Sequence, residues 1–280
     1  MKKIIASIDG SSLTKQVCKL AAWVSKKTKA KITLLHIAKP HYKFEAKANN
    51  ISGAIGLGAK SSLLKELTKI DENRGKAEQK RGQEILRTAK KITEKENISK
   101  IETEHKRGEV TQIICDAQKD SDLIILGKYG DSLCEIGSNI EEVARSITKP
   151  LLIASKNVKT IKRFLIAFDG SKNSQKAVQY AIKNSLLKDL ECHLLKIGEN
   201  DNNEPLDKAE ESLIDAGFTV ITNIKNQKPV EETVTKYIQK HKIDLLAIGA
   251  YGHSKIRNII FGSTTSALIN KSNVPILLFR

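Results

Sequence analysis

The sequence predicts an α/β protein built from two tandem, doubly wound open sheets with helices on both faces. Short, nearly continuous apolar runs such as IIASI, LIILG and LLAIG are typical of parallel strands that are buried on both faces. The segments between such runs carry apolar residues at spacings of three and four, as in Val17, Leu20, Ala21 and Val24, which indicates helices. Sheets of this class bind ligands beyond the carboxyl ends of their strands, at a point where the strand order reverses.

An internal repeat shows that this pattern occurs twice. We call the two copies the first lobe (residues 1–155) and the second lobe (residues 160–280), joined around SKNVKT, and we expect each to be a domain. The matching segments come in the same order in both lobes: Lys2–Val24 with Lys162–Ile182, Lys31–Ile37 with Glu191–Ile197, Asp122–Gly130 with Asp244–Gly252, and Lys149–Ala154 with Val274–Phe279.

The lobes differ by an insertion at about residues 40 to 95. Asp9 and Gly127 are 118 positions apart, whereas Asp169 and Gly249 are 80 apart, a surplus of 38 for the first lobe. Within the insertion, Ser62–Glu94 has the pattern of a long charged helix. The insertion could cover a ligand cleft or serve as an interaction arm. In its Ala59-Lys60-Ser61 sequence, alanine stands where a Walker phosphate-binding loop has its second glycine. We therefore expect this segment to be a connecting loop and not a phosphate site.

Composition narrows the class of protein. No apolar run approaches the roughly 20 residues of a membrane span. At the N-terminus, Asp9 interrupts the sequence before the apolar region of a signal peptide could form. We therefore expect a cytoplasmic protein without a membrane partner. Four dispersed cysteines without CxxC and six dispersed histidines predict buried thiols and no metal site. The net charge of +16 comes from lysines interleaved with acidic residues and not with aromatic ones, which favours a solvated surface over a nucleic-acid groove.

The glycine-rich turn of the second lobe carries the candidate chemistry. Its spacing is Gly249-x2-Gly252-x9-Gly262-Ser263, after an apolar strand and before a helix that includes Thr264. Anions bind at a helix N-terminus, and glycines allow close backbone approach. The turn also contains side chains that can offset phosphate charge, namely His253, Lys255 and Arg257. An ordinary strand–loop–helix turn with a capping serine is the plainer alternative.

A second turn at the same edge favours a ligand. Asp169-Gly170-Ser171 follows the first strand of the second lobe, so Asp169 can face a nucleoside while the glycine turn holds phosphates. This combination resembles the ATP-binding motif of the universal stress protein family, and the whole chain outside residues 40–95 resembles a tandem member. The resemblance implies five mainly parallel strands in each lobe and ATP in the second lobe. It implicates Asp169, Ile197, Gly249, Gly252, Gly262, Ser263 and Thr264.

The first lobe departs from the motif. Its spacing is Gly127-x2-Gly130-x6-Gly137-Ser138, three residues shorter, and its loop carries Asp131 and Glu135 in place of cations. Each carboxylate would weaken the binding of a triphosphate by about 1 kcal/mol, because its charge repels the phosphates through a screened Coulomb interaction. We therefore predict that the first lobe binds nucleotide weakly or not at all. A different ligand there stays open.

These patterns lead to one main functional hypothesis and two alternatives. The main hypothesis is an ATP-binding stress-response regulator without a catalytic residue, in which Mg²⁺ can accompany ATP and a protein partner is unknown. By the same resemblance, Leu151–Ala154 and Ile276–Phe279 would pair within the chain as a pseudo-dimer, and further association into a homodimer stays open. The alternatives are a slow ATPase or phosphotransfer enzyme, for which no Walker, kinase or nucleophile-elbow motif is present, and an ATP-independent binder of anionic partners.

Overall fold

The computed structural model describes residues 1–38, 57–128, 138–198, 202–226, 228–250 and 263–280, with the side chains of residues 57–67, 71, 138 and 139 excepted. The described strands are β1 (Lys3–Ser7), β2 (Lys31–Ala38), β3 (Ile101–Arg107), β4 (Leu123–Gly127), β5 (Leu151–Ala154), β6 (Arg163–Phe168), β7 (Glu191–Ile197), β8 (Val220–Lys225), β9 (Leu245–Gly249) and β10 (Ile276–Phe279). The described helices are α1 (Thr14–Thr28), α2 (Leu57–Glu94), α3 (Val110–Ala117), α4 (Ser138–Ser146), α5 (Lys172–Lys183), α6 (Glu204–Asp215), α7 (Val230–His241) and α8 (Ser263–Lys271), and a short 3₁₀ turn covers Gln118–Asp120.

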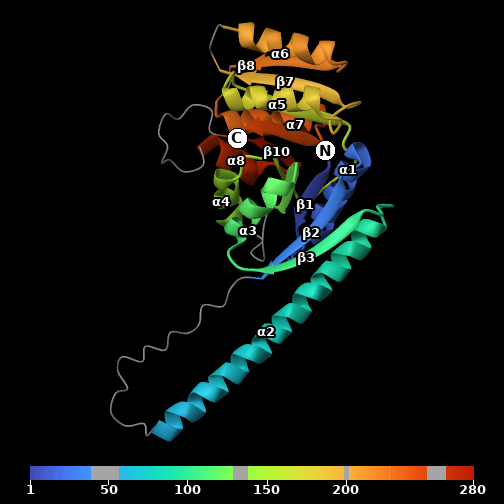
Figure 1. Ribbon diagram of the computed structural model, residues 1–280. Helices are drawn as coiled ribbons and strands as arrows, with labels where there is room; N and C mark the ends of the chain where they lie inside the picture. The colour runs from blue at the N-terminus through green and yellow to red at the C-terminus, as the bar shows by residue number, and fades with distance from the viewer. Residues whose placement is uncertain (39–56, 129–137, 199–201, 227, 251–262) are drawn as a thin grey trace.

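The strands form one ten-stranded sheet in the order β3-β2-β1-β4-β5-β10-β9-β6-β7-β8 (Figure 1). Each lobe contributes five strands, and all pairs within a lobe are parallel. This confirms the predicted α/β class. The two lobes meet where β5 and β10 pair antiparallel, with Leu277 opposite Leu152. The predicted pairing of these two segments within one chain is therefore also confirmed.

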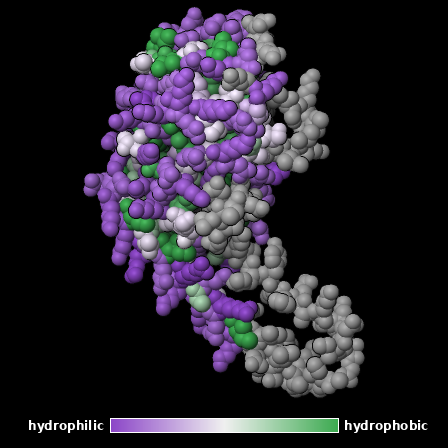
Figure 2. Space-filling view, turned by 180° about the vertical axis from the view of Figure 1, so that it is seen from behind, coloured by the Kyte–Doolittle hydropathy of each residue, from purple (hydrophilic) through white to green (hydrophobic). Residues whose placement is uncertain are grey.

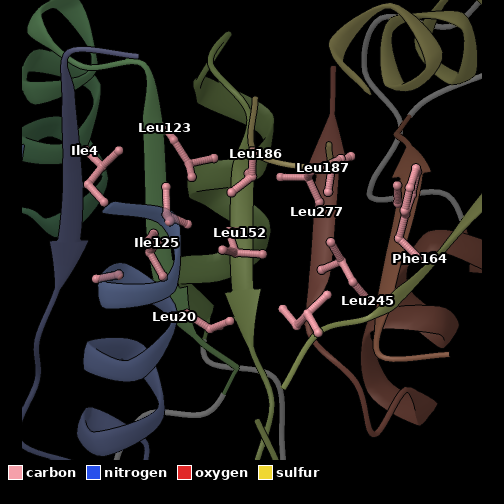
Figure 3. Close-up of a cluster of buried hydrophobic side chains, with 14 of the residues drawn as sticks. Ile4, Leu20, Leu123, Ile125, Leu152, Phe164, Leu186, Leu187, Leu245 and Leu277 are labelled. Atoms are coloured by element: carbon pink, nitrogen blue, oxygen red, sulfur yellow. The ribbon is translucent and has the colours of Figure 1, made fainter. Parts of the chain in front are cut away.

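Two hydrophobic layers cover the sheet, one on each face, because successive side chains of a strand point to opposite faces. In β4, for example, Leu123 and Ile125 belong to the layer under α1, α2, α5 and α6, whereas Ile124 and Leu126 belong to the layer under α3, α4, α7 and α8. Each layer contains residues of both lobes, and Figure 3 shows the first one running without a break from Ile4 past Leu152 and Leu277 to Phe164. The lobes thus share their core.

The insertion contains the whole of α2, which begins at Leu57, ahead of the predicted start at Ser62. Its C-terminal half packs on the first lobe through Leu86 and Ala89, which are buried. Its N-terminal half extends past the sheet and away from the rest of the molecule (Figure 1). Ile70 on this part is 42% exposed. The surface seen in Figure 2 is otherwise mainly hydrophilic, with apolar residues in small separate groups, as expected for a chain with 29% charged residues.

Candidate functional site

The carboxyl ends of three neighbouring strands bring the predicted second-lobe residues to one edge. Strand β6 pairs with β9 on one side and β7 on the other, so Gly249 at the end of β9 and Ile197 at the end of β7 flank Asp169, which follows β6. Chain connections leave β6 toward β7 and return at β9, so this is the topological switch point of the lobe. Ligands bind at such points in open α/β sheets.

The turn after β6 has a defined conformation with an open outer side. The Asp169 carboxylate accepts a hydrogen bond from the Ser171 backbone N–H at 3.0 Å, and the Ser171 hydroxyl accepts from the Ser174 N–H at 3.2 Å, which caps α5. Gly170 has φ of +76°, which favours glycine, and a Cβ placed there would meet no atom within 4 Å. Asp169 itself is exposed. The turn therefore presents a carboxylate and accessible backbone at the carboxyl edge.

Gly249 is required for a reason that the spacing does not reveal. A Cβ at Gly249 would lie 2.6 Å from the Ser174 backbone nitrogen and 2.7 Å from the Asn173 carbonyl carbon, so only glycine lets β9 end against the first turn of α5. The Asn173 side-chain amide also donates to the Ala250 carbonyl. Together these contacts tie the two turns of the edge to each other. Asn173 is a site residue that sequence reasoning missed, because its partner is 77 positions away.

The start of α8 is accessible to an anion. Ser263 and Thr264 begin this helix, both are exposed, and its first turn has no acidic residue. The positive end of the helix dipole favours an anion at this turn, although the Glu141 carboxylate of α4 already accepts a hydrogen bond there from the Ser266 hydroxyl at 3.4 Å. Three other predicted site residues, Gly252, His253 and Gly262, lie outside the described residues.

The end of β7 has a structural role beside the predicted one. Ile197 is half-buried and packs against the layer under α7 and α8. The preceding Lys196 is buried, and its ammonium donates to the Asn202 carbonyl and the Asn203 side-chain oxygen, both at 2.7 Å. Lys196 therefore anchors the start of α6.

The corresponding turn of the first lobe is contacted by α2. Asp9 makes the same turn contact, with its carboxylate accepting from the Ser11 N–H at 2.9 Å, and Gly10 has φ of +81°. Here, however, a Cβ on Gly10 would lie 2.8 Å from the Cδ1 atom of Ile85 on α2. Helix α2 also approaches the sheet at Gly82, where an added Cβ would meet the His105 ring at 2.6 Å. The insertion helix thus narrows the space beside the first-lobe turn, although Asp9 and Gly10 are themselves exposed, as Asp169 is in the second lobe.

Metal sites, membrane spans and reactive cysteines are the other features that bear on function. Within the described residues, no group of three or more His, Cys, Asp or Glu side chains could hold a metal ion. Among the described helices, none is long and apolar enough to cross a membrane. Of the cysteines, Cys18 and Cys192 are buried and free, and burial raises the pKa of the Cys18 thiol to about 11, as is typical of unreactive core thiols. Cys134 lies outside the described residues.

Comparison with known proteins defines the family. The model of the universal stress protein family matches residues 1–155 and 201–280. The chain belongs to the universal stress protein family. It is 35% identical to universal stress protein Slr1230 of Synechocystis sp. (strain ATCC 27184 / PCC 6803 / Kazusa) over 289 aligned residues, which cover all of both chains.

Solved structures of universal stress proteins share the fold. The crystal structure of a universal stress protein from Archaeoglobus fulgidus DSM 4304 matches with a TM-score of 0.70 at 18% identity, and 99% of this chain and 98% of that chain are covered. A putative universal stress protein from Pseudomonas aeruginosa UCBPP-PA14 matches with a TM-score of 0.62 at 15% identity, with 100% and 93% covered. This universal stress protein therefore has the tandem architecture of full-length relatives.

Proposed function

We propose that this universal stress protein is a regulatory ATP-binding protein that holds one nucleotide in its second lobe. The observation that carries the proposal is the contrast between two equivalent turns. No atom lies within 4 Å of the place of a Cβ on Gly170 of the second lobe, whereas Ile85 of α2 stands in that place beside Gly10 of the first lobe. The second-lobe turn therefore leaves room for a ligand that α2 narrows at the first-lobe turn.

The groups at this edge suit the two ends of ATP. Asp169 and the end of β7 would contact the nucleoside, because a carboxylate and backbone groups can accept and donate hydrogen bonds to a ribose or a base. The exposed start of α8 would receive the phosphates with Ser263 and Thr264, together with the glycine turn that contains Gly252, His253 and Gly262. Mg²⁺ would be carried by the phosphates.

The proposed function is binding, and we assign no catalytic residue. In this view, nucleotide occupancy changes which partner the protein binds. An enzyme would show steady, multiple-turnover release of phosphate from ATP. A binder of anionic partners, driven by the net charge of +16, would bind them in a salt-dependent way without ATP.

Thermal unfolding with and without ATP tests the proposal. A ligand present at a hundred times its Kd and bound only to the native state raises the free energy of unfolding by about 2.7 kcal/mol. We therefore expect MgATP to raise the melting temperature of the purified protein. Mass spectrometry of protein purified without added nucleotide supplies a second readout. The absence of both a thermal shift and co-purified ATP would overturn the proposal.

A further inference from the structure

A buried lysine of the first lobe reaches across to the second lobe. Lys128 follows β4, and its backbone N–H donates to the Ala154 carbonyl at 3.0 Å, which fixes it beside β5. Its side chain is only 4% exposed. The ammonium group donates to the Asn270 carbonyl at 2.6 Å and to the Ser272 carbonyl at 2.9 Å, 142 and 144 positions along the chain.

These carbonyls stand at the C-terminal end of α8, which ends at Lys271. The last carbonyls of a helix lack intrahelical partners, and a cation beside them is stabilising. Burial, together with the nearby charge of Lys156, lowers the pKa of Lys128 to about 8. Burying an ammonium group costs free energy, and the hydrogen bonds to the Asn270 and Ser272 carbonyls offset this cost for Lys128.

The other end of the same helix is the proposed phosphate site. With nine residues, α8 is about 13.5 Å long, and an axial shift of so short a helix displaces both of its ends. A second first-lobe contact lies between the two ends, where the Ser266 hydroxyl donates to the Glu141 carboxylate of α4 at 3.4 Å. The position of Ser263 at the start of α8 therefore depends on contacts that the first lobe supplies.

The second lobe has no lysine at the equivalent position. The residue equivalent to Lys128 is Ala250, whose backbone N–H donates to the Phe279 carbonyl at 2.7 Å in the same way. Its methyl group cannot donate to the end of α4. The lobe whose glycine turn is shortened thus carries the lysine, and the lobe whose glycine turn has full spacing receives it.

We propose that Lys128 is a positioning residue for the nucleotide site of the second lobe, which it supports by fixing the axial position of α8 from the first lobe. The inference rests on the proposed function and deepens it. It gives the first lobe a part in ATP binding although its own glycine turn is shortened and acidic.

Replacing Lys128 tests the inference. Lys128→Met replaces the lysine with an unbranched apolar side chain of similar length. The change removes the ammonium group that donates to the carbonyls at the end of α8. We expect isothermal titration calorimetry at pH 7 to show a Kd for MgATP about tenfold higher than that of the wild type. The matched control is Lys156→Met, which removes a neighbouring positive charge from an exposed side chain and should leave the Kd within twofold.

The outcomes separate this inference from the proposed function. A folded Lys128→Met protein whose Kd stays within twofold of wild type overturns the inference and leaves the proposed function standing. A wild-type protein that binds no ATP overturns both. If Lys128→Met does not fold, acetylation of the wild type by acetic anhydride decides. ATP should slow modification of Lys128 at least threefold by mass spectrometry, and an unchanged rate would count against the inference.

Discussion

Gly252→Val is expected to weaken ATP binding at least a hundredfold. Gly252 belongs to the turn that follows β9, and by the spacing of the motif it is where the backbone must approach the phosphates closely. A branched side chain would hold the phosphates away from the backbone N–H groups, and valine also disfavours the unusual backbone angles that glycine allows. Isothermal titration calorimetry of the variant with MgATP measures the effect directly.

The matched control is the same change in the first lobe, Gly130→Val. Because the first-lobe glycine turn is three residues shorter and carries Asp131 and Glu135 in place of cations, we expect this variant to keep the ATP affinity of the wild type within twofold. If Gly130→Val instead removes most of the binding, the nucleotide site has been assigned to the wrong lobe.

Leu277→Ala is expected to destabilise both lobes together, by about 3 kcal/mol. Leu277 is fully buried in β10 and stands opposite Leu152 of β5, at the junction of the two lobes (Figure 3). Truncation leaves a cavity in a core layer that contains residues of both lobes. The exposed edge-strand variant Ile221→Ala, at a residue 38% exposed, should cost less than about 1 kcal/mol.

The single tryptophan makes this prediction easy to read. Trp23 lies on α1 in the first lobe, so its fluorescence follows that lobe alone, whereas far-ultraviolet circular dichroism follows both. Urea unfolding of Leu277→Ala should shift both signals to the same lower midpoint. If the Trp23 transition stays at its wild-type midpoint while the circular dichroism splits, the lobes unfold independently and the shared core does not couple them.

The strands that could be predicted from the sequence are those buried on both faces. Runs such as LIILG and LLAIG are unambiguous because burial on both sides requires continuous apolar residues. The edge strands β3 and β8 carry no such run, since IETEHKR and VITNIK each have one neighbouring strand and half-exposed side chains. Only the family resemblance, with its five strands per lobe, indicated that these strands exist.

The parts of the candidate site that could be predicted are those formed by residues close together in the sequence. The Asp169-Gly170-Ser171 turn and the helix start at Ser263 follow from residue type and spacing. Contacts between distant segments were not predictable, because spacing does not reveal which atoms meet in space. The packing of Ile85 on Gly10 and the reach of Lys128 to α8 are of this kind. Both concern the first lobe, whose shortened turn had suggested only a weakened copy.

Under the proposed function, the two lobes of this universal stress protein divide one task. The second lobe would bind the nucleotide at the turn that contains Gly170 and at the exposed start of α8. The first lobe packs Ile85 of α2 beside its own turn and reaches the C-terminal end of α8 through Lys128.

The number of ATP molecules bound per chain tests this division most directly. Isothermal titration calorimetry of the wild-type protein with MgATP gives that number together with the affinity. One high-affinity site per chain is the predicted result. Two equivalent sites would contradict the difference between the lobes, and the absence of binding would contradict a nucleotide site in this protein.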